Sequence, residues 1–253
     1  MVKLSIIMPA YNEEKRIGPT LERYSAFFDE HYPDYEIFVI LNGCKDNTLE
    51  IVKDYANKFD NIRFKNYKEA IGKGGAIIEG FKLVEGDFIG FVDADCATPP
   101  KAFFELVKNI GGNQGIIASR WLDGSKIGQK QPFLRRFFSR GFNLFVKLNF
   151  FFHYTDTQCG AKLFTKRAVK KIYPYLGLTR WAFDIDILYH MKRNKFRVIE
   201  YPTEWNDQEG SKLNAKKAIP NMFLSVVRLR LLYSPFKFIV IMHDFVKFNV
   251  FGK

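Results

Sequence analysis

Short apolar runs alternate with longer amphipathic segments in the first half of the chain, and this alternation limits the possible folds more than any other feature. We predict strands at 4–8, 36–41, 62–66, 87–93 and 114–119, with helices in the segments between them. Asn12 is expected to cap the first of these helices. Strands that alternate with helices form a mostly parallel sheet covered on both faces. The sequence therefore predicts an α/β fold whose ligands bind beyond the carboxyl ends of the strands.

Length, charge and cysteine spacing narrow the class of protein. The chain has 253 residues, enough for one large α/β domain, and its formal net charge of +12 favours anionic partners. Nucleotides, nucleic acid and a membrane surface all fit that charge, but the sequence contains no finger or RNP-type motif, so we expect no nucleic-acid partner. Three widely spaced cysteines and a start that reads directly as a strand favour a reducing, cytoplasmic location.

Polar side chains follow three of the predicted strands. Asn12 and Asn42 come after the first two, and Asp93 and Asp95 come after the fourth. Because the carboxyl ends of parallel strands meet at one edge, we expect these side chains to face one crevice. Two carboxylates spaced in this way suit Mg²⁺ or Mn²⁺, which complete their shells with substrate phosphates. The alternative is an ordinary turn in which the Asp side chains cap backbone amides.

A glycine-rich stretch, Gly72-Lys73-Gly74-Gly75, precedes the third predicted helix, which we place near 76–84. Its backbone amides and the Lys73 side chain together resemble a phosphate-binding nest. The spacing does not match a Walker A motif, and a flexible start to a helix is the simpler alternative.

From residue 131 onward, basic and aromatic residues become frequent. Arg136, Arg140, Asn143 and Lys147 recur at three- and four-residue spacing, which predicts a polar, largely basic helical stripe. The stretch 236–251 is the most apolar, but charged residues interrupt it and it falls short of the ~20 apolar residues that cross a bilayer. Amphipathic helices of this composition lie among lipid headgroups, so we expect a peripheral association with a membrane surface. A packed core or a homodimer surface is the alternative.

Three motifs stand at the predicted strand ends: Pro9-Ala10-Tyr11-Asn12-Glu13-Glu14, Asp93-Ala94-Asp95 and Ser119-Arg120. Together they resemble the family 2 glycosyltransferases, which have the nucleotide-diphospho-sugar (GT-A, Rossmann-like) fold. The stretch RRFFSRGFN at 135–143 is similar to the polyprenyl-phosphate hexose synthases of that family. The stretches DTQCGAKLFT at 156–165, RWAFDID at 180–186 and EGSKL at 209–213 resemble its dolichyl-phosphate β-glucosyltransferase branch.

The resemblance implies a donor site built from matching residues. The side chains expected around the nucleobase and ribose are Pro9, Tyr11, Glu13 and Asn42. Lys73 and Asp93 would lie beside the donor diphosphate, with Asp95 as the principal metal ligand and Asp93 as the second. The residues expected to shape the sugar pocket are Asp156, Gln158, Asp184 and Asp186.

The resemblance also implies an acceptor site and a division of the chain. The residues expected to hold an acceptor phosphate are Arg120, Arg135, Ser139, Arg140, Ser211 and Lys212, the last two on a loop that closes over the site. We assign 1–215 to the GT-A domain and 216–253 to a C-terminal amphipathic, membrane-interfacial helical segment.

The sequence departs from the family pattern at three places. Leu41-Asn42-Gly43-Cys44 stands where the family has Asp-Asp-Gly-Ser, so both carboxylates of that motif are missing. Ala97 stands where the mannosyl branch has Gln, which favours the glucosyl-like branch and leaves a metal with fewer protein ligands. Members of that branch commonly carry an N-terminal membrane helix, which we do not find in this sequence.

We hold three hypotheses for the function. The leading one is an enzyme on the cytoplasmic face of a membrane that transfers a hexose, with glucose favoured, from a nucleotide sugar, with UDP-glucose favoured, to dolichyl or polyprenyl phosphate with inversion. The acceptor phosphate is already an oxyanion, so it needs cations rather than a base. The second hypothesis keeps the fold and the donor but uses a saccharide hydroxyl, for which Asp184 or Asp186 would be the base. A non-catalytic basic binding module is the third.

Overall fold

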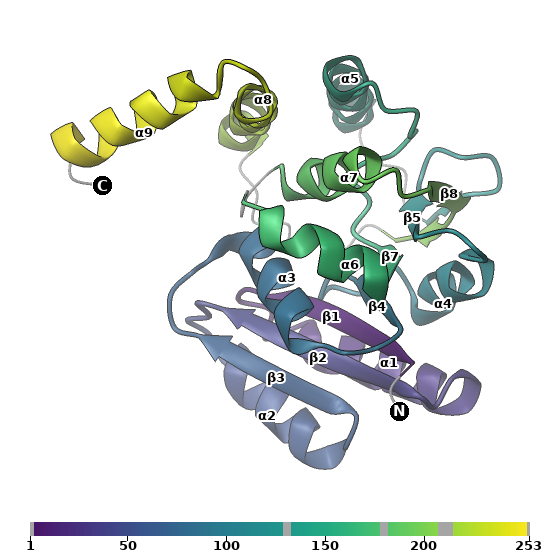
Figure 1. Ribbon diagram of the computed structural model, residues 1–253. Coiled ribbons are helices and arrows are strands. Elements are labelled where there is room, and N and C mark those ends of the chain that lie inside the picture. Colours follow the sequence, from purple (N-terminus) through teal and green to yellow (C-terminus); the bar gives the residue numbers. More distant parts are fainter. Residues whose placement is uncertain (1–2, 129–132, 178–181, 207–214, 252–253) are drawn as a thin grey trace.

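Seven strands in the described part of the chain form one mixed sheet, in the order β3-β2-β1-β4-β7-β5-β8 (Figure 1). The computed structural model describes residues 3–128, 133–177, 182–206 and 215–251, with side chains for 3–128, 138–177, 182–206 and 220–245. The strands of the sheet are β1 (Leu4–Ala10), β2 (Tyr35–Asn42), β3 (Ile62–Tyr67), β4 (Phe88–Phe91), β5 (Gly115–Ser119), β7 (Lys162–Thr165) and β8 (Val198–Pro202). A small second sheet pairs β6 (Lys126–Ile127) with β9 (Glu204–Trp205).

The predicted α/β fold with a mostly parallel sheet is confirmed. β1 runs parallel to β2 and β4, β2 runs parallel to β3, and β5 runs parallel to β8. The exception is β7, which is antiparallel to both β4 and β5 and was not predicted as a strand. In its register Phe91, the last residue of β4, lies opposite Lys162, the first residue of β7. The residues that precede β7 therefore lie beside those that follow β4.

Helices cover both faces of the sheet. One face carries α1 (Ile17–His31), α2 (Thr48–Lys58) and α4 (Pro100–Asn109), and the other carries α3 (Gly72–Leu83), α6 (Lys166–Ile172) and α7 (Phe183–Arg193). Successive side chains of β1 point to opposite faces, so that Ile6 packs in the first layer and Ile7 packs in the second. A short 3₁₀ turn, Tyr173–Tyr175, follows α6. Both faces are buried, which explains why the strands are continuous apolar runs.

The first helix begins later than predicted, and the prediction that Asn12 caps it was wrong. α1 begins at Ile17, and Asn12 has a left-handed backbone with φ of 55°. The Oδ1 atom of Asn12 accepts a hydrogen bond from the amide of Lys45 at 2.8 Å. Asn tolerates this backbone conformation because its short side chain can bond locally. The side chain therefore joins the loops after β1 and β2 and does not start the helix.

The third helix begins earlier than predicted, at Gly72. Gly72 has φ of 79°, a value that glycine adopts without steric penalty. The glycine-rich stretch is therefore the first turn of α3 and not a loop before it.

Three further helices lie together at one end of the molecule: α5 (Phe133–Phe150), α8 (Ala215–Leu232) and α9 (Lys237–Phe251) (Figure 1). Residues of α5, α7 and α8 share a buried cluster that includes Phe142, Ile185 and Leu229. Helix α9 extends away from the rest of the chain (Figure 1), and the ion pair of Arg228 with Asp244 joins it to α8. Among the helices that the structure describes, none combines the length and the apolar character that a bilayer crossing requires.

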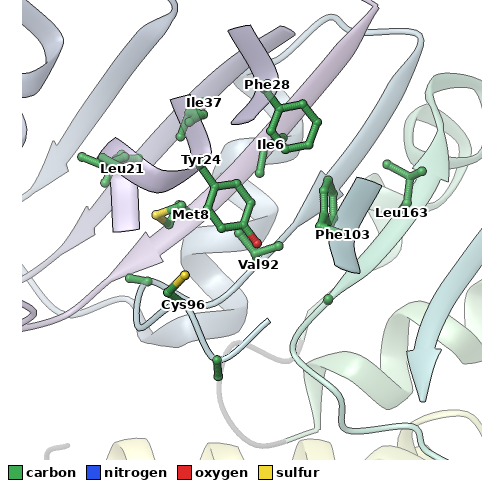
Figure 2. Close-up of a cluster of buried hydrophobic side chains, with 14 of the residues drawn as sticks. Ile6, Met8, Leu21, Tyr24, Phe28, Ile37, Val92, Cys96, Phe103 and Leu163 are labelled. Atoms are coloured by element: carbon green, nitrogen blue, oxygen red, sulfur yellow. The ribbon is translucent and has the colours of Figure 1, made fainter. Parts of the chain in front are cut away.

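Tyr24 of α1 offers a test of how the first helical layer is held. Its ring is wholly buried in the core (Figure 2), and its hydroxyl donates to the carbonyl of Thr98 at 2.7 Å. We expect Tyr24→Phe to lower the free energy of unfolding by about 1–3 kcal/mol, because a buried carbonyl loses this hydrogen bond. Urea denaturation measures the change. In the control Tyr175→Phe, whose side chain is 63% exposed, the change should stay within about 0.5 kcal/mol. Equal effects of the two substitutions would contradict the prediction.

Candidate active site

Asp93 and Asp95 lie on the loop that follows β4. The hydroxyl of Thr20 in α1 donates to the carbonyl of Ala94 at 3.0 Å and so fastens this loop to the first helix. The Oδ1 atom of Asp95 accepts a hydrogen bond from the amide of Ala97 at 3.0 Å. One carboxylate thus caps a backbone amide, as the simpler alternative from the sequence expected. The other carboxylate, Asp93, faces a lysine.

Lys73 of α3 supplies the positive charge beside Asp93, with which it forms an ion pair. Burial by itself would lower the pKa of Lys73, but the carboxylates of Asp93 and Asp184 outweigh burial and raise it. The Lys73 ammonium also lies 5.6 Å from the centre of the Phe183 ring. A charged amine is therefore held beside the loop that follows β4.

A divalent cation fits the carboxylate pair on electrostatic grounds. Burial, and then the neighbouring charge of Asp93, raises the pKa of Asp95. A cation between the two carboxylates would relieve this repulsion. Among the described residues there is no group of three or more His, Cys, Asp or Glu side chains suited to a metal. Asp93 and Asp95 would be the two protein ligands, and a bound phosphate would supply others.

The residues predicted for the nucleobase and ribose follow β1. Pro9 lies within the strand, and Tyr11 comes just after it with 49% of its side chain exposed. Glu13 accepts two hydrogen bonds from Arg16, at 2.6 and 2.9 Å. Burial raises the pKa of Glu13, and Asp95 and Asp93 add to that effect while Arg16 opposes it. Glu13 is therefore electrostatically part of the same acidic region as the carboxylate pair.

Asn42, at the end of β2, fastens the start of α3. Its Oδ1 atom accepts hydrogen bonds from the amides of Ile71 at 2.6 Å and Gly72 at 3.1 Å. Two amides that could have belonged to a phosphate nest are thus bound within the protein. The part of the glycine-rich stretch that reaches the carboxylate pair is the side chain of Lys73.

Arg120 and Asp156 form a buried, two-pronged ion pair. Nε of Arg120 lies 2.7 Å from Oδ2 of Asp156, and Nη2 lies 3.0 Å from Oδ1. Burial would raise the pKa of Asp156, but the charge of Arg120 prevails and lowers it. The rings of Trp121 and Trp205 lie 5.9 and 5.4 Å from the guanidinium carbon. The charge of Arg120 is therefore already balanced inside the protein.

Arg140 also lies near Trp121. Its guanidinium carbon is 5.2 Å from the centre of that ring, and its side chain is exposed. Ser139 precedes it on α5. The structure thus brings Arg120 and Arg140 to the same indole, which the sequence did not indicate. The other predicted acceptor residues have side chains outside the described part of the chain: Arg135, Ser211 and Lys212.

Asp184 and Asp186, in the first turn of α7, are both buried. Asp184 accepts a hydrogen bond from the ammonium of Lys162 at 2.5 Å. Asp186 accepts one from the hydroxyl of Tyr233 at 2.5 Å and one from the amide of Gly177 at 3.1 Å. Asp186 therefore links α7 to α8, while Asp184 lies on the side of Lys73, whose charge acts on it.

Gln158 and Gly160 belong to the segment that leads into β7. The Nε2 atom of Gln158 is buried and has no hydrogen-bond partner among the residues that the structure describes. A methyl group on Gly160 would overlap the Oδ2 atom of Asp93, so the absence of a side chain leaves room for that carboxylate. Sequence reasoning named Gln158 but missed the roles of Gly160 and Lys162. The signal for Lys162 was a lysine inside an apolar run, where a charge needs a buried partner.

Comparison with known proteins bears out the family resemblance. The model of the family described as "Glycosyl transferase family 2" matches residues 5–173. The chain is 36% identical over 245 residues to the dolichyl-phosphate beta-glucosyltransferase of Dictyostelium discoideum. The alignment covers 92% of this chain and 75% of that protein. It is 34% identical over 226 residues to the dolichyl-phosphate beta-glucosyltransferase of Homo sapiens, which covers 83% of this chain and 69% of that protein.

A solved structure with the same fold is glucosyl-3-phosphoglycerate synthase from Mycobacterium tuberculosis in complex with Mn²⁺, UDP and phosphoglyceric acid. It has a TM-score of 0.67 at 15% sequence identity, and the match covers 90% of this chain and 78% of that one. At this identity the likeness concerns the fold alone. The predicted GT-A architecture is confirmed.

Gly160→Ala tests whether the space at β7 positions Asp93. We expect the new methyl group to push the Asp93 carboxylate away from Lys73 and to weaken Mn²⁺ binding, measured by calorimetry with UDP present, by about 10- to 100-fold, as losses of supporting contacts around metal ligands do. Gly112→Ala is the control, because a Cβ atom there would meet nothing within 4 Å. If both variants bind Mn²⁺ with the same affinity, Gly160 has no such role.

Proposed function

The chain belongs to glycosyl transferase family 2, and from this premise we propose that it transfers glucose from UDP-glucose to a dolichyl or related polyprenyl phosphate. The relatives named dolichyl-phosphate beta-glucosyltransferase, at 36% and 34% identity over most of the chain, support both the sugar and the acceptor. Transfer by a single displacement would invert the anomeric carbon. The proposal for the donor nucleotide is supported by a neighbour with the same fold that binds UDP.

The observation that carries the proposal is the charge arrangement at the end of β4. The charges of Asp93 and Asp95 act on one another, and Lys73 forms an ion pair with Asp93. A nucleoside diphosphate brings two negatively charged phosphates, which need a cation held by carboxylates together with a fixed ammonium. Lys73 would orient the leaving diphosphate and hold part of its charge. Asp95, fixed by the amide of Ala97, would keep its position as the donor binds.

Mg²⁺ or Mn²⁺ is the cofactor that this carboxylate pair would hold. When bound, such an ion would neutralise part of the negative charge that develops on the departing diphosphate. Asp93 and Asp95 are the protein ligands in this proposal, and the donor supplies the rest. The complex of the M. tuberculosis neighbour with Mn²⁺ and UDP supports it.

A phosphate acceptor fits the site better than a sugar hydroxyl. A hydroxyl needs a base to take its proton, and the two candidates for that base are engaged in the interior, Asp184 with Lys162 and Asp186 with Tyr233. A phosphate oxygen attacks without losing a proton. Arg140, exposed and close to the Trp121 ring, is the described cation best placed to receive it, and Arg120 lies near the same indole. We assign Arg135, Ser139, Ser211 and Lys212 to the same acceptor site.

The sugar pocket is proposed to lie beside the Arg120–Asp156 pair. Asp156 is fixed by that pair, and the amide of Gln158 donates to its Oδ1 atom at 3.1 Å. The buried Nε2 atom of Gln158 is a hydrogen-bond donor that a sugar hydroxyl would satisfy.

A lipid acceptor requires the enzyme to work at a membrane, and we propose that α8 and α9 provide the contact. Large apolar side chains are exposed there, among them Leu224 at 64%, Phe238 at 54%, Ile241 at 57% and Met242 at 62%. Exposed apolar helices dotted with Lys and Arg bind lipid headgroup regions. We place the enzyme peripherally on the cytoplasmic face, with 1–215 as the catalytic domain and 216–253 as the membrane segment. A homodimer that buries the same surface is the alternative.

The central test of the function is transfer to a lipid. Incubation with labelled UDP-glucose, Mn²⁺ and dolichyl phosphate should give a labelled glycolipid, measured by solvent extraction. Asp95→Asn should reduce the rate by at least about 100-fold, because the donor loses a metal-binding carboxylate. Lys108→Gln, a surface substitution on α4, serves as the control and should keep the full rate. Failure to label a lipid with any common nucleotide sugar would refute the proposal.

Membrane binding is tested with anionic liposomes at low salt. We expect the protein to co-sediment with them and the double variant Phe238→Ser, Ile241→Ser to bind at least about tenfold more weakly, since it removes two apolar side chains from α9. Leu83→Ser, which changes a side chain 42% exposed on α3, should bind normally. If the double variant changes the oligomeric state in light scattering and leaves liposome binding intact, the surface is a dimer interface.

A further inference from the structure

Lys162 carries a positive charge into the centre of the protein, where nothing in the reaction described so far uses it. It is the first residue of β7, and its side chain is completely inaccessible. Its ammonium donates to the carbonyl of Cys159 at 2.6 Å and to Oδ1 of Asp184 at 2.5 Å, and it lies 5.5 Å from the centre of the Phe91 ring. A buried ammonium is stable only when it is paired in this way. An apolar side chain could fill the same space without a buried charge. The charge of Lys162 therefore needs an explanation other than packing.

The ion pair of Lys162 belongs to a series of neighbouring charges that begins at the carboxylate pair and alternates in sign from Asp93 onward. Asp95 lies within the field of Asp93, and Asp93 pairs with Lys73. The charge of Lys73 acts on Asp184, which pairs in turn with Lys162. Asp184 is thus in direct contact with Lys162, and Lys73 lies 5.6 Å from the centre of the ring of Phe183, the residue that precedes Asp184. One lysine belongs to the candidate donor site, and the other belongs to the interior.

Each of the two lysines lies near an aromatic ring. Lys73 lies against Phe183 and Lys162 lies against Phe91, and the centres of these two rings are 6.0 Å apart. The side chains of Lys162 and Asp184 are 0% and 7% exposed, so water screens the interaction between these two charges little. A change at Lys162 would therefore be felt at Asp184 and, through it, at Lys73.

We propose that Lys162 is a positioning residue, which binds Asp184 from the interior so that Lys73 stays directed at Asp93 and the donor diphosphate. Without Lys162, the carboxylate of Asp184 has Lys73 as its neighbouring cation and draws that ammonium inward. The diphosphate then loses the fixed charge beside it. This inference rests on the proposed function, because it assigns Lys73 to a diphosphate donor. Charged groups that face Asp184 are Lys162, Lys73 and Asp93.

A double-mutant cycle separates this role from packing. The variants are Lys162→Met, Asp184→Asn and the two together, and Lys170→Met, an exposed lysine of α6, is the control. We expect Lys162→Met to lower kcat between about tenfold and a hundredfold, as a small displacement of a catalytic group does. The double variant should be no slower than Asp184→Asn alone, because Lys162 acts through Asp184. Losses that simply multiply, or a Lys162→Met rate equal to that of the control, would overturn the proposal.

UDP binding distinguishes failure of this inference from failure of the proposed function. The affinity for UDP with Mn²⁺, measured by calorimetry, does not depend on the acceptor. The affinity for UDP should fall in Lys162→Met by the same factor as kcat/KM for the donor. In the double variant, the affinity for UDP should equal that of Asp184→Asn. If the wild-type protein binds UDP but labels no lipid, the proposed acceptor is refuted. The comparison of UDP affinities between the wild-type protein and the variants stays valid in that case. An unchanged UDP affinity in Lys162→Met overturns the role of Lys162.

If Lys162→Met folds poorly, the free energy of unfolding of the variants, measured against pH, still tests the proposal. Burial already raises the pKa of Asp184, and Lys162 and Lys73 oppose that effect. Without Lys162 the pKa of Asp184 should rise further, so the folded variant would hold this proton to a still higher pH than the unfolded chain does. Stability lost in this way grows as pH rises above the ordinary Asp pKa of about 3.9. The double variant, which has no carboxylate at 184, should fold and lose this pH dependence. If the double variant also fails to fold, Lys162 serves packing and the proposal is overturned.

Discussion

The antiparallel pairing of β7 with β4 fixes the charged groups on which the site depends. Phe91 lies opposite Lys162, so the segment that leads into β7 meets the loop that leaves β4. Gly160 leaves the space that the Asp93 carboxylate occupies, and Lys162 brings its ammonium to Asp184. A parallel β7 would carry its amino end to the opposite edge of the sheet. The antiparallel direction of this one short strand therefore places two features at the ends of the parallel strands: the space beside Gly160 and the ammonium of Lys162.

Several charged side chains of the candidate site form ion pairs with one another. Lys73 pairs with Asp93, Arg120 pairs with Asp156, and Lys162 pairs with Asp184, each time between different elements of the fold. The pairs Arg120–Asp156 and Lys162–Asp184 are largely buried, where the dielectric is low and an unpaired charge is very unfavourable. The folded chain therefore holds the groups that we assign to the donor site in place before any substrate arrives. Electrostatic preorganisation of this kind is effective because it needs no rearrangement during the reaction.

Helix α7 connects that region to the C-terminal helices. Its first turn carries Asp184, on the side of Lys73, and Asp186, which accepts a hydrogen bond from Tyr233 near the end of α8. The Nε2 atom of His190 lies 2.7 Å from the same tyrosine hydroxyl. The end of α8 is thus joined, through the first turn of α7, to Asp184, on which the charge of Lys73 acts. An enzyme with a lipid substrate needs its membrane segment and its donor site to keep a fixed relation.

The sequence by itself determined the α/β class, the parallel strands, the strand-end carboxylates and the family, because periodicity and short motifs are local properties of the chain. It did not determine the direction of β7, the buried positions of Asp184 and Asp186, or the indole that Arg120 and Arg140 share. Asn12 shows the same limit, since its left-handed backbone follows from a contact with the loop after β2. These features depend on contacts between residues far apart in the chain. Only the packed structure decides which buried charges become partners.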